Sequence, residues 1–189
     1  MFQELVINSR SYRRFKQDKQ IERETLWDLV ELARLTPSAR NRQPLKYFLS
    51  CDPDTNSKIF PCLGWAGYLK DWEGPAQGER PSAYIIVLGD TEVSREFWCD
   101  HGIVSQTILL GAVEKGLGGC MIGTIDRELL REFLNLEVKL EILLVLALGE
   151  PDEKVVIEEV KEDKDIKYWR DGEGVHHVPK RHLKDIIVN

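Results

Sequence analysis

Residues 141–148 read EILLVLAL, and GEP follows at 149–151. The run is apolar almost without alternation, which is typical of a strand buried on both faces. The glycine and proline of GEP then end the extended segment. The stretch therefore predicts the central strand of a sheet that is covered on both sides.

Shorter patterns place the other elements around this strand. Apolar, β-branched runs predict two more strands, at 46–51 (KYFLSC) and 83–89 (AYIIVLG). Apolar residues at helical spacing predict three helices, at 22–35, 97–115 and 126–134, the last with Asp126 as its N-cap. GLGGCMIG at 116–123 predicts a glycine-rich turn into a short strand. We therefore expect a mixed chain of helices and strands without internal repeats.

The composition bounds the class of protein. A chain of 189 residues, 42% of them hydrophobic, fits one domain, residues 1–189. Its longest apolar stretch, 142–148, is far shorter than the roughly 20 residues of a membrane helix, and the N-terminus lacks a secretory pattern. The cysteines lie far apart without a CxxC pair, which fits a reducing cytoplasm. The net charge of −6 argues against nucleic acid or an anionic membrane as a general partner.

The C-terminal segment differs from the rest. Residues 152–165 are strongly charged and are expected to wind over the surface. The following residues return to aromatic and basic types before the apolar Ile186, Ile187 and Val188. A charged excursion with a strand-like tail indicates an arm, 152–189, that packs elsewhere, for example on a second subunit.

Basic residues gather near the N-terminus, in NSRSYRRF at 8–15. Arg10, Arg13 and Arg14 stand beside Ser9 and Ser11. Guanidinium groups and hydroxyls suit a phosphate dianion, because arginine forms charge-assisted, bidentate hydrogen bonds. Taken alone, the segment is explained more simply by a solvated basic face or by partners for nearby carboxylates.

Two loops offer groups to a flat, polar ligand. TPSARNRQP at 36–44 would bring backbone N–H groups and Asn41 close to a polar ring edge, although an ordinary loop bounded by prolines fits as well. The glycines of 116–123 permit close backbone approach to a ligand, but a tight turn before a core strand needs them too. Neither a G-x-G-x-x-G fingerprint nor a Walker A motif occurs.

Four motifs together resemble the nitroreductase family of FMN flavoproteins. RSYRRF resembles its R-S-x-R-x-F, PSARNRQP its P-S-x-x-N-x-Q-P, GLGGCMIG its G-x-G-x-C-x-I-G, and VPKRHL its basic pair before the last strand. They occur in family order over 9–183, nearly the whole chain. Leu45 stands where an aromatic residue often follows the Q-P pair, and Arg40 and Arg42 make this loop unusually basic.

The resemblance implies an α+β fold, with a mixed central sheet flanked by helices, in an intertwined homodimer that binds one FMN at each end of its interface. It implies that Arg10, Ser11 and Arg13 hold the phosphate and flavin edge, with Lys180 or Arg181 adding charge. Ser38, Ala39 and Asn41 would face the flavin from the other subunit. Ile122 and Gly123 would offer backbone groups to its ring system.

Residues 61–81 are rich in aromatic side chains and resemble the family's variable insertion over the flavin. Trp65, Tyr68 and Trp72 would then stack on nicotinamide or on a flat acceptor. The same rings could instead fill a local core or a subunit interface.

No catalytic side chain is predicted. Cys99, Asp100 and His101 are adjacent, as are His176 and His177, but adjacent side chains diverge and no metal-binding spacing supports them. The resemblance implies an enzyme in which FMN takes hydride from NADH or NADPH and reduces a nitroaromatic, a quinone or a similar conjugated acceptor. The alternatives are a low-turnover flavin sensor or carrier and a flavin-free interaction protein.

Overall fold

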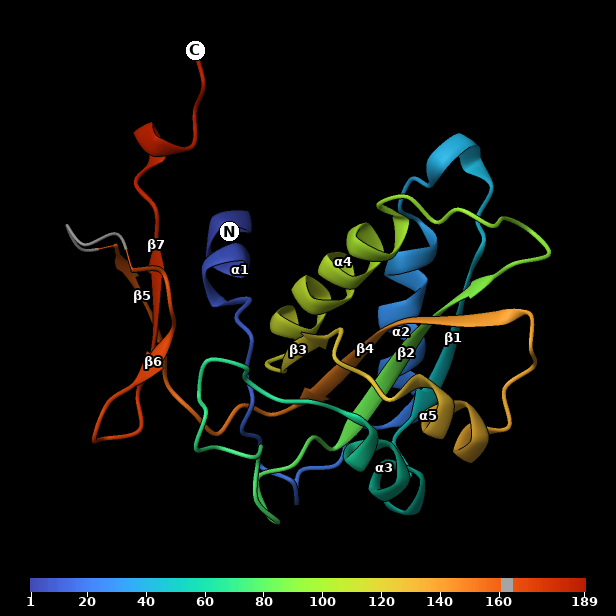
Figure 1. Cartoon of the computed structure of the whole chain (residues 1–189), viewed down its shortest axis with the longest axis horizontal. Coiled ribbons are helices and arrows are strands. Elements are labelled where there is room, and N and C mark those ends of the chain that lie inside the picture. Colours follow the sequence, from blue (N-terminus) through green and yellow to red (C-terminus); the bar gives the residue numbers. More distant parts are fainter. Residues whose placement is uncertain (161–164) are drawn as a thin grey trace.

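The computed structural model describes residues 1–160 and 165–189, which form a body and an arm (Figure 1). The body holds a four-stranded sheet with helices on both faces. The arm holds a separate three-stranded sheet, and the chain beyond it projects away from the body. Within the described ranges, no helix is long and apolar enough to cross a membrane.

The body sheet has the strand order β1-β2-β4-β3, with neighbouring strands antiparallel. Its strands are β1 (Leu45–Ser50), β2 (Ala83–Asp90), β3 (Gly118–Ile122) and β4 (Leu140–Gly149). The predicted strand at 141–148 is thus one of two central strands. Every residue of β2 is buried, whereas β4 is fully buried only toward its C-terminal end.

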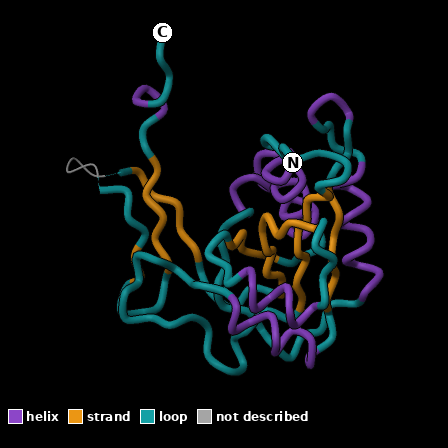
Figure 2. Tube along the Cα trace, turned by 45° about the vertical axis from the view of Figure 1, so that its right-hand side comes forward, coloured by secondary structure: helices purple, strands orange, loops and turns teal. Residues whose placement is uncertain are grey.

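Side-chain alternation along β2 divides the core into two layers. Ile85 and Val87 pack with residues of α2 (Arg23–Arg34) and α4 (Asp100–Glu114). Ile86 and Leu88 point to the opposite face, where Leu130 of α5 (Arg127–Leu134) closes the second cluster. Figure 2 shows helices on both sides of the sheet. The expected α+β fold with flanking helices is confirmed.

The start of α5 is determined by its N-cap residue. Asp126 accepts a hydrogen bond from the backbone N–H of Leu129, which confirms the predicted N-cap. The periodicity did not predict α1 (Phe2–Asn8) or α3 (Pro53–Ile59), because each is short and buries few apolar residues. Short 3₁₀ turns complete the chain: η1 (Ala39–Asn41), η2 (Phe60–Cys62) and η3 (Leu183–Asp185).

The arm sheet joins β5 (Val155–Glu159), β6 (Trp169–Arg170) and β7 (His176–Lys180). Strand β7 lies between them, parallel to β5 and antiparallel to β6. The charged stretch 152–165 therefore contains a strand that was not predicted, and its residues 161–164 lie outside the described part of the chain.

The end of the chain also departs from expectation. The basic pair lies at the end of β7 rather than before a final strand, and Ile186–Val188 follow a 3₁₀ turn in an exposed position. A tail of this kind can form a strand only when it meets a hydrogen-bonding partner.

Candidate functional site

Two adjoining cavities meet at Arg13. The first, which we call the arm cavity, has a volume of about 260 Å³ and is lined by Ser9, Arg10, Ser11, Arg13, Tyr168, His176, Val178 and Lys180. The second, the glycine cavity, has a volume of about 240 Å³ and is lined by Arg13, Gly64–Gly67 and Cys120–Thr124. The tertiary structure thus brings both ends of the chain to one place.

The arginines of the arm cavity, Arg13 buried and Arg10 half-buried, have no acidic partners among the described residues. Arg13 is 9% exposed, and its Nη1 donates to the carbonyl oxygen of Ser11 at 3.3 Å. Arg10 donates from Nη2 to the carbonyl of Val6 at 2.7 Å, and burial lowers the pKa of its guanidinium. Within the described residues, neither side chain forms an ion pair with a carboxylate, and no Asp or Glu lines this cavity. Such a site is suited to an anionic ligand.

Glycines allow the arginine segment to lie against the body sheet. Ser11 forms a parallel bridge with Gly119, and the backbone N–H of Tyr12 donates to the carbonyl of Gly119 at 3.1 Å. A Cβ on Gly118 would lie 2.5 Å from the ring of Tyr12. The glycine-rich motif therefore accommodates the arginine segment, and the Ser11–Gly119 bridge supplies the one parallel pairing described along the body sheet.

A buried carboxylate fastens this segment to the arm. The Glu153 side chain is 1% exposed and accepts hydrogen bonds from the backbone N–H groups of Arg13 and Arg14. The Arg170 guanidinium donates to its other oxygen at 2.7 Å. The negative charge of Glu153 is thus neutralised by β6, and the Arg13 side chain stays free of it.

The arm supplies two residues that the motifs did not indicate. The guanidinium carbon of Arg13 lies 4.7 Å from the centre of the Tyr168 ring, which in turn packs against His176 at 5.2 Å. Burial, reinforced by the charge of Arg13, lowers the pKa of His176 to about 4. The signal was a hairpin: DGEG at 171–174 separates two short runs that alternate between faces.

Besides Arg13, the glycine cavity holds three of the predicted residues, Trp65, Ile122 and Gly123. Ile122 pairs with Val145 in the body sheet, so its backbone is fixed. Gly123 is exposed, and a Cβ there would meet only Leu144, at 3.9 Å. This end of β3 therefore leaves room for a flat group beside the backbone.

The loop that contains Ser38, Ala39 and Asn41 lines neither cavity. It lies at the N-terminus of α4, where the buried Asp100 accepts hydrogen bonds from the backbone N–H of Ala39 at 2.9 and 3.2 Å. Arg40 and Asn41 have φ angles of 54° and 53°, which are uncommon for residues other than glycine. The loop is thus held in an unusual conformation, and it lies outside the two cavities that Arg10 and Arg13 line.

The remaining predicted residues have different surroundings. Tyr68 packs against Tyr168, with ring centres 5.0 Å apart. Trp72 lies near two guanidinium groups, at 4.7 Å from Arg170 and 6.0 Å from Arg14. Arg181 is exposed and lines neither cavity. In this chain, Tyr68 and Trp72 therefore contact the arm and its attachment.

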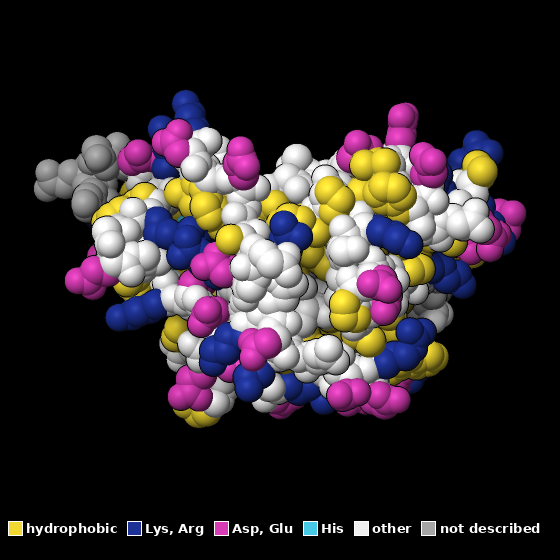
Figure 3. Space-filling model, turned by 90° about the horizontal axis from the view of Figure 1, so that it is seen from below, with side chains coloured by type: hydrophobic (Ala, Val, Ile, Leu, Met, Phe, Trp, Pro, Cys, Tyr) yellow, Lys and Arg dark blue, Asp and Glu magenta, His cyan; other side chains and the backbone are white. Residues whose placement is uncertain are grey.

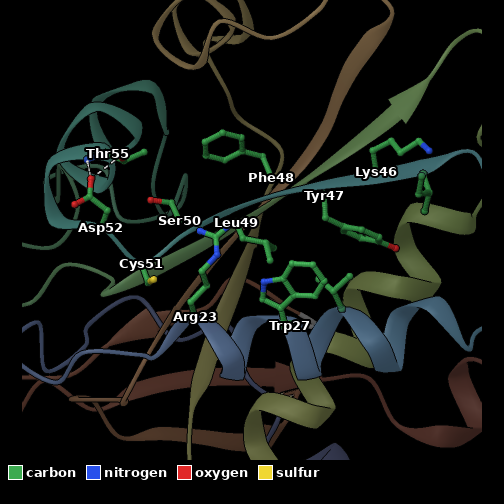
Figure 4. A pocket seen from close by; sticks show the side chains of 12 residues that line it. Arg23, Trp27, Lys46, Tyr47, Phe48, Leu49, Ser50, Cys51, Asp52 and Thr55 are labelled. Carbon is green, nitrogen blue, oxygen red and sulfur yellow. Dashed lines mark hydrogen bonds between the residues drawn. The ribbon is translucent and has the colours of Figure 1, made fainter.

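The most voluminous cavity described, about 570 Å³, lies elsewhere, between α2 and the edge strand β1 (Figure 4). Trp27 and Tyr47 border it, and burial raises the pKa of Tyr47 to about 12. None of the predicted site residues lines it. Among the described residues, no group of three or more His, Cys, Asp or Glu side chains could hold a metal ion.

The surface gives no simple charge pattern on the face shown in Figure 3. Acidic and basic side chains are interspersed there, with apolar groups between them.

Comparison with known proteins identifies the family. Residues 7–150 match the model of the nitroreductase family, so the chain belongs to that family of oxidoreductases. A protein of Archaeoglobus fulgidus, provisionally named NADH dehydrogenase/NAD(P)H nitroreductase, is 29% identical over 159 residues, which cover 79% of this chain and 86% of the relative.

Solved structures share the fold. A nitroreductase family protein of Streptococcus pneumoniae superimposes with a TM-score of 0.74 and 18% identity, and all of both chains is covered. An FMN-dependent nitroreductase of Clostridium difficile has a TM-score of 0.66 and 22% identity, and covers 79% of this chain and 87% of its own.

Proposed function

We propose that the protein is an FMN-dependent oxidoreductase that uses NADH or NADPH to reduce a nitroaromatic, a quinone or a similar conjugated acceptor. The observation that carries the proposal is the arm cavity, in which Arg10, Arg13 and Lys180 converge without an acidic side chain among the described residues. Bound FMN would supply hydride transfer. Family membership supports the oxidoreductase class.

The residues present fit the cofactor. Its phosphate dianion needs several cations and hydroxyls, which Arg10, Ser11, Arg13 and Lys180 offer. Arg181 follows directly after Lys180 and would add charge at the cavity's rim. The adjoining glycine cavity would take the ring system beside the backbone of Ile122 and Gly123.

The backbone near Gly123 would act on the reduced form. N–H groups directed at the polar edge of the ring would stabilise the negative charge that reduction places there. Trp65 lines the same cavity and is our candidate for contact with nicotinamide or the acceptor. Tyr68 and Trp72 do not line this cavity and instead contact Tyr168 and Arg170 of the arm. No side chain is proposed as an obligatory proton donor.

We propose that the working unit is a homodimer. Ser38, Ala39 and Asn41 line neither cavity that Arg10 and Arg13 of the same chain border, so they would complete the site of a second copy. The projecting arm, with Ile186 and Ile187 59% and 53% exposed, is suited to packing on that copy.

FMN titration tests the cofactor assignment. Replacing Arg10 and Arg13 together by alanine should weaken binding by about 3–6 kcal/mol, since each charge-assisted contact contributes about 1.5–3 kcal/mol. Arg34→Ala is the control, because Arg34 pairs with Glu31 on the exposed face of α2. An unchanged titration in the double variant would reject the assignment.

Turnover separates the enzyme from a flavin sensor or carrier. The FMN-loaded protein should oxidise NADH or NADPH continuously when menadione or nitrofurazone is supplied. FMN that stays bound but is reduced by neither nucleotide would favour the sensor or carrier. A colourless protein that takes up no FMN would leave only the flavin-free interaction protein.

A further inference from the structure

His176 is the arm residue that contacts the Arg13 side chain through a hydrogen bond. His176 is 1% exposed, and its Nε2 atom lies 3.2 Å from Nη1 of Arg13. A guanidinium group carries only donors, so Nε2 must be the acceptor and Nδ1 must carry the ring hydrogen. The imidazole is therefore neutral.

The charges around His176 favour that neutral form. Arg13 faces it from the N-terminal segment, Arg170 from β6, and His177 is its neighbour on β7. The nearby carboxylate of Glu153 accepts hydrogen bonds from the Arg170 guanidinium and from the backbone N–H groups of Arg13 and Arg14. A proton on His176 would thus be placed beside two guanidinium groups in a buried site.

The contact limits how Arg13 can be oriented. Both hydrogen bonds that the Arg13 side chain makes to described residues use Nη1, one to the carbonyl oxygen of Ser11 and one to Nε2 of His176. The guanidinium carbon also lies over the Tyr168 ring. Among the described contacts, Nη2 and Nε are left for a ligand in the two cavities that Arg13 borders.

We propose that His176 is a positioning residue, which fixes the Arg13 guanidinium before an oxyanion enters the arm cavity. Fixing a flexible arginine in advance removes part of the ordering cost from binding. The proposal rests on the proposed function, in that the oxyanion is taken to belong to FMN. Protonation of His176 would remove the acceptor and add a repulsive charge.

Two substitutions separate positioning from simple packing. His176→Phe keeps a ring against Tyr168 but has no acceptor, whereas His176→Gln restores an acceptor oxygen near the position of Nε2. His177→Phe is the matched control, since the His177 side chain pairs with Glu158 and Asp171 and stacks on Trp169 instead of contacting Arg13. Circular dichroism checks that each variant is folded.

FMN titration at pH 7 gives the first readout. We expect His176→Phe to weaken binding about tenfold or more, and His176→Gln and His177→Phe to stay within about threefold of the wild type. Equal loss in His176→Phe and His176→Gln, or no loss in His176→Phe, would overturn the proposal.

Nitrogen NMR of the wild-type imidazole gives a readout that does not need the cofactor. The spectrum at pH 7 should show His176 as the neutral tautomer protonated at Nδ1, and it should stay so down to about pH 5. A tautomer protonated at Nε2, or a charged ring at pH 7, would overturn the proposal. A wild type that shows the expected tautomer but binds no FMN would instead reject the proposed function.

Discussion

The body sheet and the arm sheet are held together by different forces. Strand β2 is buried at every position between two layers of helices. Strand β5 has no buried residue, and stacked rings such as Trp169 on His177, with centres 4.1 Å apart, hold the arm sheet together. The carboxylate of Glu153 fastens the arm by accepting hydrogen bonds from the backbone N–H groups of Arg13 and Arg14. The body therefore depends on apolar burial, whereas docking of the arm depends on charge.

Removing apolar volume should affect the body most. Leu146 in β4 is fully buried, so Leu146→Ala should lower the free energy of unfolding by about 4 kcal/mol through lost burial and a residual cavity. Urea unfolding measures the loss. Ile157→Ala in β5 is the control, since Ile157 is 39% exposed and should cost less than about 1 kcal/mol. Similar losses in both variants would remove the contrast between the two sheets.

Breaking the buried ion pair should affect the arm more than the body. Glu153→Gln leaves Arg170 buried without its counter-charge, which should destabilise arm docking by about 3 kcal/mol. Hydrogen exchange in β5–β7 should then be roughly a hundredfold faster, while amides of β2 keep their protection. Faster exchange in β2 to the same degree would show that arm and body unfold together.

Acid should weaken the fold through His176. Because burial lowers the folded-state pKa of His176 to about 4, the unfolded chain binds the proton first as the pH falls below about 6.5. Stability should therefore fall by about 2 kcal/mol between pH 7 and pH 5 from this group alone. The measurement is the difference in urea unfolding between wild type and His176→Gln at the two pH values. Parallel changes in both proteins would contradict it.

His177 should act in the opposite direction and with the smallest effect. Its pairing with Asp171 and Glu158 raises its pKa above the usual value. The stabilisation is complete below the unfolded pKa and is lost as the pH rises through the raised, folded-state pKa. Proteolysis of the arm should therefore accelerate in mildly alkaline buffer in the wild type. The same acceleration in His177→Gln would exclude His177 as its source.

The sequence predicted a helix or strand correctly where the pattern that specifies it lies within that one element. The runs at 83–89 and 141–148 became β2 and β4, and Asp126 became an N-cap, because these patterns act within a few residues. α3 was missed although Asp52 caps it and Pro53 begins it, since only Asn56 and Ile59 are buried. β5 was missed because its partner, β7, lies some twenty residues further along the chain and pairs in parallel.

The sequence also predicted part of the candidate site. Arginines at 10 and 13 and the lysine at 180 indicated an anionic ligand from residue type alone, and they now line one cavity. Tyr168 and His176 were not indicated as site residues, because a single tyrosine or histidine has no distinctive spacing. Their role depends on a neighbour more than 150 residues away in the chain.

The amino-acid order by itself determined the apolar runs and the helical spacing of apolar residues, and hence most helices and strands of the body, because these patterns are encoded within a few residues. It also determined which cations could meet a phosphate. Only the folded arrangement decided that Glu153 neutralises Arg170 and leaves Arg13 to His176, since the pairing of buried charges depends on which distant segments share a low-dielectric space.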